Sequence, residues 1–314
     1  MILVSQPDDP AVFAPPRGVP KVRNAEPTFS LAHLTLIGCS APELVYIAAR
    51  CGYDAVSPRF IPMHVAGEFA CEAEDMEMVQ ATKAALHNTG IRVGELELVR
   101  ILDDMEPQYC EPAMALAAEM GAQRMITSVW LSEPADRNYI VDRYIDLCEL
   151  AAQYGLTVDL EFPTFSTLRT LRAAADIVRA AEQPNGGILI DMIYSEFSQL
   201  NPKELDVLPP EWFHFLHVAD VPQEPPKTKK EQIQIARGAR LYPGEGRIDF
   251  SAIIDRLPPL TYSIELPNLE RVEQYGYEGH ARRCLEAAKR TLLNKTESRI
   301  PNPPSEDRAQ PHTP

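Results

Sequence analysis

The sequence predicts an α/β protein folded as a single (β/α)8 barrel, and three observations support this prediction. Short apolar or β-branched runs alternate with longer segments in which apolar residues recur about every 3.6 positions. Eight such pairs fit between residues 31 and 295, which is about the length of one eight-fold barrel. Several helical segments end in a glycine just before the next strand, as left-handed helix caps do, at Gly52, Gly90, Gly121 and Gly155.

The elements follow in order along this stretch. The expected strands span residues 31–38, 53–60, 91–99, 124–130, 156–162, 187–194, 213–221 and 261–266. The expected helices span residues 41–52, 76–90, 111–122, 139–155, 167–182, 202–208, 249–257 and 278–294, of which 202–208 has the weakest pattern. An open, doubly wound sheet is the alternative that periodicity alone leaves. The sequence has neither a G-x-G-x-x-G after the first strand nor a G-x-x-x-x-G-K-[ST], so a dinucleotide or P-loop site has little support.

Proline-rich ends flank the expected barrel. Six of the 29 prolines lie in residues 1–30 and five in residues 296–314, and neither segment has a periodic apolar face. We therefore expect an extended N-terminal arm (1–30), a barrel domain (31–295) and a disordered C-terminal tail (296–314). Residues 222–239 are polar and rich in Pro and Lys, and they are expected to form a long loop on the rim above the active site.

Charge and composition limit the partners. There are 30 Lys and Arg against 45 Asp and Glu, a net charge of −15, which opposes binding to nucleic acid or to an anionic membrane. No run approaches the roughly 18 apolar residues that span a bilayer, and the N-terminus lacks the basic region of a signal peptide. Six cysteines are scattered without a C-x-x-C pair. We expect a cytoplasmic protein with reduced thiols.

Four late strands each place an acid or an imidazole near their C-terminal end. These residues are Glu161 in "VDLEFP", Asp191 in "ILIDMIY", His217 in "FLHVADV" and Glu265 in "SIELPN". Any one of them alone is typical of a cap or an ion pair, but strand ends converge on one rim of a barrel. Three carboxylates and one imidazole suit Mn²⁺, Mg²⁺ or Co²⁺, and Zn²⁺ is also compatible.

The segments "HVADVP" (217–222), "RLYPGEGRIDF" (240–250) and "YSIELPN" (262–268) make the chain resemble a known superfamily. It is similar to the xylose isomerase-like TIM barrels, which include sugar (phosphate) isomerases and epimerases and endonuclease IV (AP endonuclease family 2). The resemblance covers about residues 31–295. It implies a metal-dependent sugar isomerase or epimerase that removes a proton beside a metal-bound carbonyl and passes through an enediolate.

The resemblance also implies roles for individual residues. One divalent metal, Mn²⁺ by preference, would be held by Glu161, Asp191, His217 and Glu265. Glu161 and Glu265 would in addition be the catalytic proton-exchanging groups, on opposite faces of a bound ketose. Arg240 would contact substrate oxygens.

Two departures keep other activities open. Epimerase-like members have D-x-x-H where this chain has "DMIY", so Tyr194 replaces a histidine that contacts substrate. The insertion at 222–239 also points to a different substrate or lid. A metal-dependent dehydratase or lyase is therefore the alternative, similar to 3-dehydroshikimate or inosose dehydratases or to enzymes that cleave C-glycosides. The acidic charge and only seven histidines disfavour endonuclease IV chemistry, and a non-catalytic binding subunit is less favoured than either enzyme.

The remaining substrate-binding candidates have weaker support. Tyr194 can hydrogen-bond a substrate hydroxyl, Trp130 at the end of strand four can stack on a sugar ring, and His64 after strand two is a spare base. Glu97 shares one face of strand three with Glu95 and would approach substrate if that face is the lumen. Each of these residues also has a purely structural interpretation, as do His33 and Arg59. We expect a small sugar-like substrate, and the two arms would suit a homo-oligomer.

Overall fold

The structure is a computed structural model that describes residues 27–293. The expected C-terminal tail (296–314) lies outside the described residues, and so does most of the expected N-terminal arm (1–30). The first strand, β1 (Phe29–Ala32), begins inside the last residues assigned to that arm. No helix among the described residues is long and apolar enough to cross a lipid bilayer.

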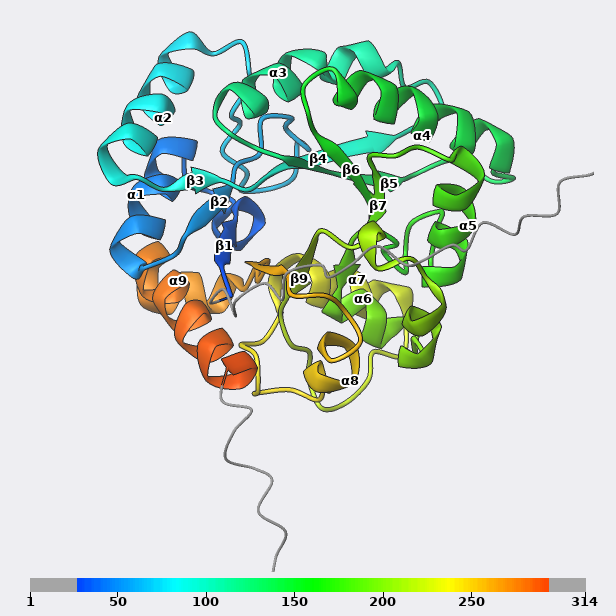
Figure 1. Ribbon diagram of the computed structural model, residues 1–314. Coiled ribbons are helices and arrows are strands. Elements are labelled where there is room, and N and C mark those ends of the chain that lie inside the picture. The colour runs from blue at the N-terminus through cyan, green and yellow to red at the C-terminus, as the bar shows by residue number, and fades with distance from the viewer. Residues whose placement is uncertain (1–26, 294–314) are drawn as a thin grey trace, which may run out of the picture.

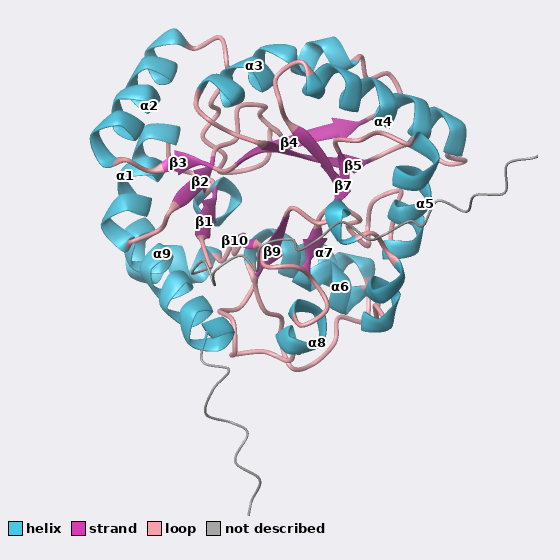
Figure 2. Ribbon diagram, viewed as in Figure 1, coloured by secondary structure: helices cyan, strands magenta, loops and turns pink. Residues whose placement is uncertain are grey.

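Parallel strands form a ring that is enclosed by helices (Figures 1 and 2), as the (β/α)8 prediction requires. Residues 27–293 form ten strands, which are β1 (Phe29–Ala32), β2 (Ala55–Ser57), β3 (Arg92–Val93), β4 (Glu95–Ile101), β5 (Arg124–Val129), β6 (Thr157–Leu160), β7 (Gly186–Ile188), β8 (Ile190–Asp191), β9 (Phe215–Val218) and β10 (Thr261–Ile264). Their ladders run in the orders β3-β2-β1-β10-β9-β8 and β4-β5-β6-β7, and every pairing is parallel. Two of the expected strands are each divided between the two ladders. Gly94 alone separates β3 from β4 within the expected strand 91–99, and Leu189 alone separates β7 from β8 within the expected strand 187–194.

Helices follow the strands along the outside of the ring. They are α1 (Ala41–Cys51), α2 (Met76–Thr89), α3 (Glu111–Glu119), α4 (Arg137–Ala152), α5 (Leu171–Ala181), α6 (Met192–Phe197), α7 (Lys229–Gly238), α8 (Phe250–Ile254) and α9 (Leu269–Leu293), which is kinked at Gly276. The four glycines expected to be left-handed all have positive φ, from +70° to +95°. At the other helix ends, side chains such as Asp75 and Thr170 accept the hydrogen bond of a free backbone N–H.

Three sequence-based expectations about elements need correction. Residues 222–239 are not one long loop, because 229–238 form α7, whose capping box pairs Thr228 with Glu231 and compensates for a polar composition. The expected first strand (31–38) stops at Ala32, where a 3-10 helix (His33–Leu36) begins. The expected strand 187–194 stops at Asp191, because the Asp191 carboxylate accepts the Ile193 N–H and starts α6.

The lower interior of the ring is filled by a small apolar cluster. Ile126, Leu189 and Phe215 are buried together there, separate from the large core between strands and helices. Phe215 and His217 lie on the same face of β9 because strand side chains alternate. The apolar cluster therefore lies below the strand-end residues and closes the barrel beneath them.

The insertion that contains α7 is tied down at both ends. Asp220 and Leu241 exchange two backbone hydrogen bonds of 2.9 and 2.8 Å, so the chain leaves and returns at the same place. A third hydrogen bond holds the returning end: the side-chain amide of Asn268 donates to the backbone carbonyl of Arg240 at 2.8 Å. The insertion is thus a closed excursion from the rim, and its two ends are held by the barrel.

Asp220 also explains the spacing of the "HVAD" and "PGEG" segments. Its carboxylate accepts four backbone N–H bonds, from Val221, Gly244, Gly246 and Ile248, at 2.9 to 3.1 Å. A Cβ on Gly246 would lie 1.9 Å from Val221 O and 2.3 Å from Asp220 Oδ1. This loop therefore requires a glycine for close backbone approach.

We predict that Gly246→Ala lowers the free energy of unfolding by about 2 kcal/mol or more, because the new methyl group must displace backbone in a packed loop. Urea unfolding followed by circular dichroism measures the change. Gly94→Ala is the matched control, since a Cβ there meets only ordinary contacts of 3.4 Å and longer. Equal stability of Gly246→Ala and Gly94→Ala would contradict the account of this loop.

Candidate metal and substrate site

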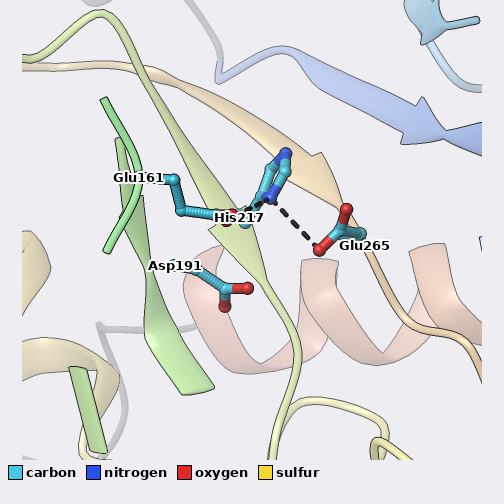
Figure 3. Close-up of side chains that lie close together, drawn as sticks. All are labelled: Glu161, Asp191, His217 and Glu265. Atoms are coloured by element: carbon cyan, nitrogen blue, oxygen red, sulfur yellow. Dashed lines mark ion pairs between the residues drawn. The ribbon is translucent and has the colours of Figure 1, made fainter. Parts of the chain in front are cut away.

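The barrel brings the four strand-end residues together, as Figure 3 shows. Glu161 follows β6, Asp191 ends β8, His217 lies in β9 and Glu265 follows β10. One potential ligand atom from each lies within 4.8 Å of the corresponding atoms of the others. His217 Nδ1 is 3.6 Å from Glu161 Oε1 and 3.3 Å from Glu265 Oε2, and all four side chains are buried.

Burial of three carboxylates at one point is costly, and two cationic groups offset the cost. Burial raises the pKa of Glu161 to about 7, and the neighbouring Glu265 and Asp191 act in the same direction against the hydrogen-bonding effect of His217. For Glu265 burial also acts upward, but His217 and Arg240 together outweigh it and hold the pKa below its usual range. Burial opposes the charged form of His217, yet Glu265 and Glu161 raise its pKa well above the ordinary value.

Arg240 is part of this cluster and has no exposed surface. Its Nη1 lies 3.0 Å from Asp191 Oδ2, and its Nη2 lies 2.8 Å from Glu265 Oε2. Nη1 also donates to the Glu265 carbonyl at 2.8 Å, and Nε donates to the Ala236 carbonyl at 2.9 Å. The structure therefore places Arg240 beside two carboxylates, where it orients them, and not on the surface of the cavity where contact with substrate oxygens was expected.

The donor set fits a divalent cation. Within the described residues, Glu161 Oε1 and His217 Nε2 are buried without a hydrogen-bond partner, and His217 Nδ1 makes only the two ion-pair contacts. Buried polar atoms are normally hydrogen-bonded, so unpaired ones that converge need another partner. Three carboxylates and one imidazole are ligands that Mn²⁺, Mg²⁺, Co²⁺ and Zn²⁺ accept.

A cavity of about 260 Å³ opens above these residues. Glu161 and Glu265 line it, whereas Asp191 and His217 do not. Two of the expected substrate-binding residues, Tyr194 and Trp130, also line it. Tyr194 lies in α6, and its hydroxyl makes no hydrogen bond to any residue between 27 and 293.

Sequence reasoning missed part of the cavity wall. Phe165 packs edge-on against Tyr194, with ring centroids 5.6 Å apart, and lies 5.8 Å from the Trp130 ring. Its position four residues after Glu161 in "EFPTF" was the available signal. A residue that follows a barrel strand so closely lies on the same rim as the strand end.

Two other candidates do not reach the cavity. His64 is exposed on the loop after β2, and its neighbours Met63 and Val65 line the cavity in its place. Glu97 is buried on the lumen side of β4, where its Oε2 accepts a 3.0 Å hydrogen bond from Arg59. Burial raises the pKa of Glu97 to about 7, and Arg59 partly offsets that effect.

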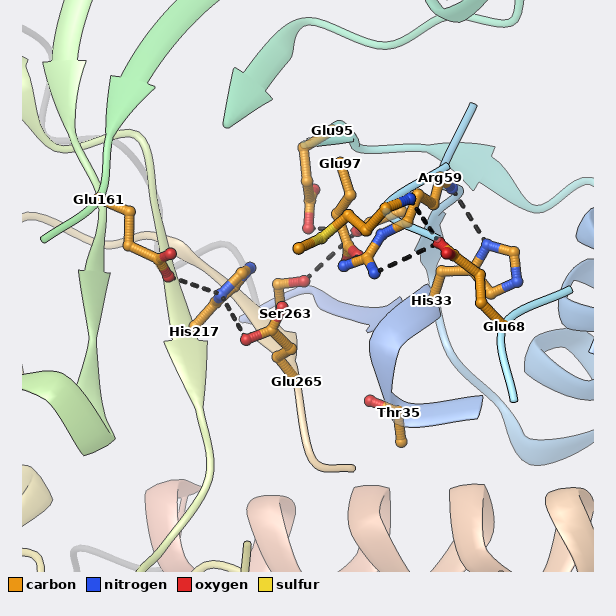
Figure 4. A network of polar contacts seen from close by, with 12 residues as sticks. His33, Thr35, Arg59, Glu68, Glu95, Glu97, Glu161, His217, Ser263 and Glu265 are labelled. Carbon is orange, nitrogen blue, oxygen red and sulfur yellow. Dashed lines mark hydrogen bonds and ion pairs between the residues drawn. The ribbon is translucent and has the colours of Figure 1, made fainter. Parts of the chain in front are cut away.

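Arg59 connects this lumen network to the rim (Figure 4). Besides Glu97, its guanidinium lies 3.8 Å from the buried carboxylate of Glu68. Glu68 in turn accepts the backbone N–H groups of Met63 at 3.0 Å and Val65 at 3.1 Å. Arg59 therefore helps to hold the loop that supplies part of the cavity wall.

His33 has a structural role. Its Nδ1 accepts the Arg59 N–H at 3.1 Å, so Nε2 carries the proton and donates to the Cys39 carbonyl at 2.8 Å. Both nitrogens are engaged in the neutral ring. Burial lowers the pKa of His33 from 6.5 to about 4.

This lowered pKa predicts a loss of stability on mild acidification. The unfolded chain takes up a proton below pH 6.5, whereas folded His33 does not until about pH 4, so this contribution is complete above pH 6.5 and is lost as the pH falls toward 4. When the pH falls from 7 to 5, the free energy of unfolding should decrease in both proteins, but the decrease should be about 2 kcal/mol smaller in His33→Gln than in the unchanged protein. Urea unfolding at both pH values measures this. His87→Gln, at an exposed position of α2, is the control and should lose as much as the unchanged protein; parallel behaviour of the two variants would contradict the prediction.

The comparison with known proteins agrees with the geometry. The chain is 24% identical to the inosose isomerase of Bacillus subtilis over 156 residues, which is 49% of this chain and 54% of that protein. It is 29% identical to the 3-dehydroshikimate dehydratase of Pseudomonas aeruginosa over 125 residues, which is 40% of this chain and 19% of that protein. The chain thus spans about half, or less, of the length of these relatives.

Among solved structures, the IOLI protein with a bound zinc atom superposes with a TM-score of 0.69 at 18% identity, covering 86% of this chain and 99% of that one. Its likeness shows the shared fold. The family described as xylose isomerase-like TIM barrel matches residues 45–285, which is more than half of the chain. This chain belongs to the xylose isomerase-like TIM barrel family.

Proposed function

We propose that this chain is a divalent-metal-dependent isomerase or epimerase of a sugar or related hydroxy-carbonyl compound. The observation that carries the proposal is the convergence of Glu161, Asp191, His217 and Glu265 at the base of the cavity. Relatives that include an isomerase and a dehydratase, and a structural neighbour with bound zinc, support a metal-assisted reaction beside a carbonyl. Mn²⁺ is the proposed ion because oxygen ligands dominate the set.

The four residues divide into two pairs by their access to the cavity. Asp191 and His217 do not line it, so they would serve only to hold the ion. Glu161 and Glu265 line it and each lies within 3.6 Å of His217 Nδ1, so each could contribute to holding the ion and also face a substrate. A bound cation would polarise the carbonyl and make the adjacent C–H more acidic. Glu161 and Glu265 would then take the proton from one carbon and return it at another position or face.

Arg240 would act as a positioning residue in this scheme. It holds Asp191 Oδ2 and Glu265 Oε2 through separate nitrogens and is itself fixed by the Ala236 and Glu265 carbonyls. A fork of this kind sets the orientation of both carboxylates more rigidly than a single point charge does.

One observation favours a dehydratase or lyase as the second candidate. Tyr194 lines the cavity, its hydroxyl has no hydrogen-bond partner among the described residues, and burial raises its pKa well above the usual value. Tyr194 therefore keeps its proton at neutral pH and can donate it to a departing hydroxyl, the step that distinguishes elimination from isomerisation.

We predict that Glu161→Gln and Glu265→Gln each lower the turnover of Mn²⁺-supplemented protein by about 10² to 10⁴, the range for loss of a general acid–base group. A screen of hydroxy-carbonyl compounds, from keto-sugars and keto-polyols to ring-bearing hydroxy-ketones, with mass detection identifies the reaction, and calorimetry measures Mn²⁺ binding. Glu119→Gln, at an exposed ion pair with Lys83, is the matched control and should behave as the unchanged protein. Undiminished turnover in either metal-loaded site variant would overturn the proposal.

The same screen separates the two candidates, because isomerisation conserves the mass of the substrate and elimination divides it. We expect conserved mass. If a product lighter by one water appears, Tyr194→Phe should abolish it while Mn²⁺ binding is kept, and the dehydratase assignment would replace the isomerase.

A further inference from the structure

The wall of the cavity above Glu161 and Glu265 is mostly apolar. It is formed by side chains from the 3-10 helix after β1, the loop after β2, β4 and the loops after β5 and β6. Those that bear on substrate recognition are Leu34, Ile37, Met63, Leu98, Trp130 and Phe165. A polyhydroxylated sugar chain would meet few hydrogen-bonding groups along this wall.

The aromatic residues of the wall present carbon to the cavity. The Trp130 indole N–H donates to Ser128 Oγ at 2.8 Å, so its one polar atom is already engaged. Phe165 stands between Trp130 and Tyr194, tilted against the first and edge-on to the second, with centroid distances of 5.8 and 5.6 Å. Such a row of rings offers an additional ring the tilted and edge-on contacts that aromatic groups prefer.

Few of the lining residues are polar. Glu161 and Glu265 belong to the metal-ligand candidates, and the Tyr194 ring lies beside Arg240, with 5.7 Å between its centroid and the guanidinium carbon. Arg237 of α7 is exposed, and the buried Arg59 directs Nη2 to Glu97 and Nη1 toward Glu68, although its Nε and Nη1 have no hydrogen-bond partner among residues 27–293. Along the apolar residues, which make up most of the lining, hydroxyl groups of a substrate would lose water without gaining partners, which disfavours their binding.

We propose that the substrate is a hydroxy-carbonyl compound that carries an apolar ring, and not a free sugar or polyol. Its hydroxy-carbonyl end would lie toward Glu161 and Glu265, and its ring would pack against Trp130 and Phe165. This inference rests on the proposed function for the position of the reacting end. The apolar wall itself is independent of that function.

Three hydroxy-ketones of the form HOCH₂–C(O)–R test this inference, because they share one end and differ in the other. In 2-hydroxyacetophenone R is phenyl, in hydroxyacetone it is methyl, and in erythrulose it is a dihydroxyethyl group. Calorimetric titration of the full chain with Mn²⁺ should show 2-hydroxyacetophenone binding at least about tenfold more tightly than erythrulose, with hydroxyacetone between them. Equal or tighter binding of erythrulose would overturn the inference.

A pair of matched variants locates the ring on this wall. Met63→Gln keeps the length of a wall side chain but adds an amide, and we expect it to weaken binding of 2-hydroxyacetophenone roughly three- to tenfold while erythrulose binding does not fall. Met76→Gln makes the same change at an exposed position at the start of α2 and should leave both affinities unchanged. Equal effects of the two substitutions would place the ring elsewhere and overturn the assignment.

A titration with Mn²⁺ alone, on protein stripped with a chelator that is then removed, followed by titrations with the three ketones, separates this inference from the proposed function. A preference for the phenyl ketone that persists while Mn²⁺ fails to bind would reject the metal-dependent reaction and keep the apolar recognition. Mn²⁺ binding together with a preference for erythrulose would do the reverse.

Discussion

The confinement of three buried carboxylates at one end of the barrel is the constraint on which the rest of the site depends. Glu161, Asp191 and Glu265 would repel one another in a region shielded from water, and His217 and Arg240, which contact them directly, offset most of that repulsion. Because the strands are parallel, these acids lie at the same end of the barrel whether or not their charges are balanced. The surrounding structure must therefore hold the cationic groups as firmly as it holds the acids.

Arg240 shows how this is done. It comes from the segment between α7 and the loop organised by Asp220, and it reaches the acids because the ladder between Asp220 and Leu241 fixes its backbone. Four N–H bonds to the Asp220 carboxylate and the missing Cβ of Gly246 shape the chain beyond it. The run from His217 to Asp249 thus combines one ligand candidate, one loop anchor and one charge partner, so much of its sequence pattern has a structural cause.

The sequence predicted the barrel and the meeting of the four strand-end residues, because both follow from periodicity and from the common direction of parallel strands. It predicted less well the places where a side chain hydrogen-bonds to the backbone and thereby starts a helix. The Asp191 carboxylate caps α6 and shortens its strand, and the capping box of Thr228 and Glu231 turns an apparent loop into α7. Trp130 and Tyr194 were placed in the cavity, whereas the orientation of His64 depends on a loop conformation with φ of +55° that no periodic pattern encodes.

The closed excursion that carries α7 has a consequence for how such proteins diversify. Both of its ends are held by the barrel, while its helix contributes Ala236 and Arg237 to the cavity. Its side chains can therefore change without moving the strand-end acids, provided that its backbone keeps the Ala236 carbonyl on Arg240 Nε. Evolution, or a protein engineer, can thus replace the cavity-lining side chain of Arg237 and alter which molecules the cavity admits while the chemistry beneath it is inherited intact.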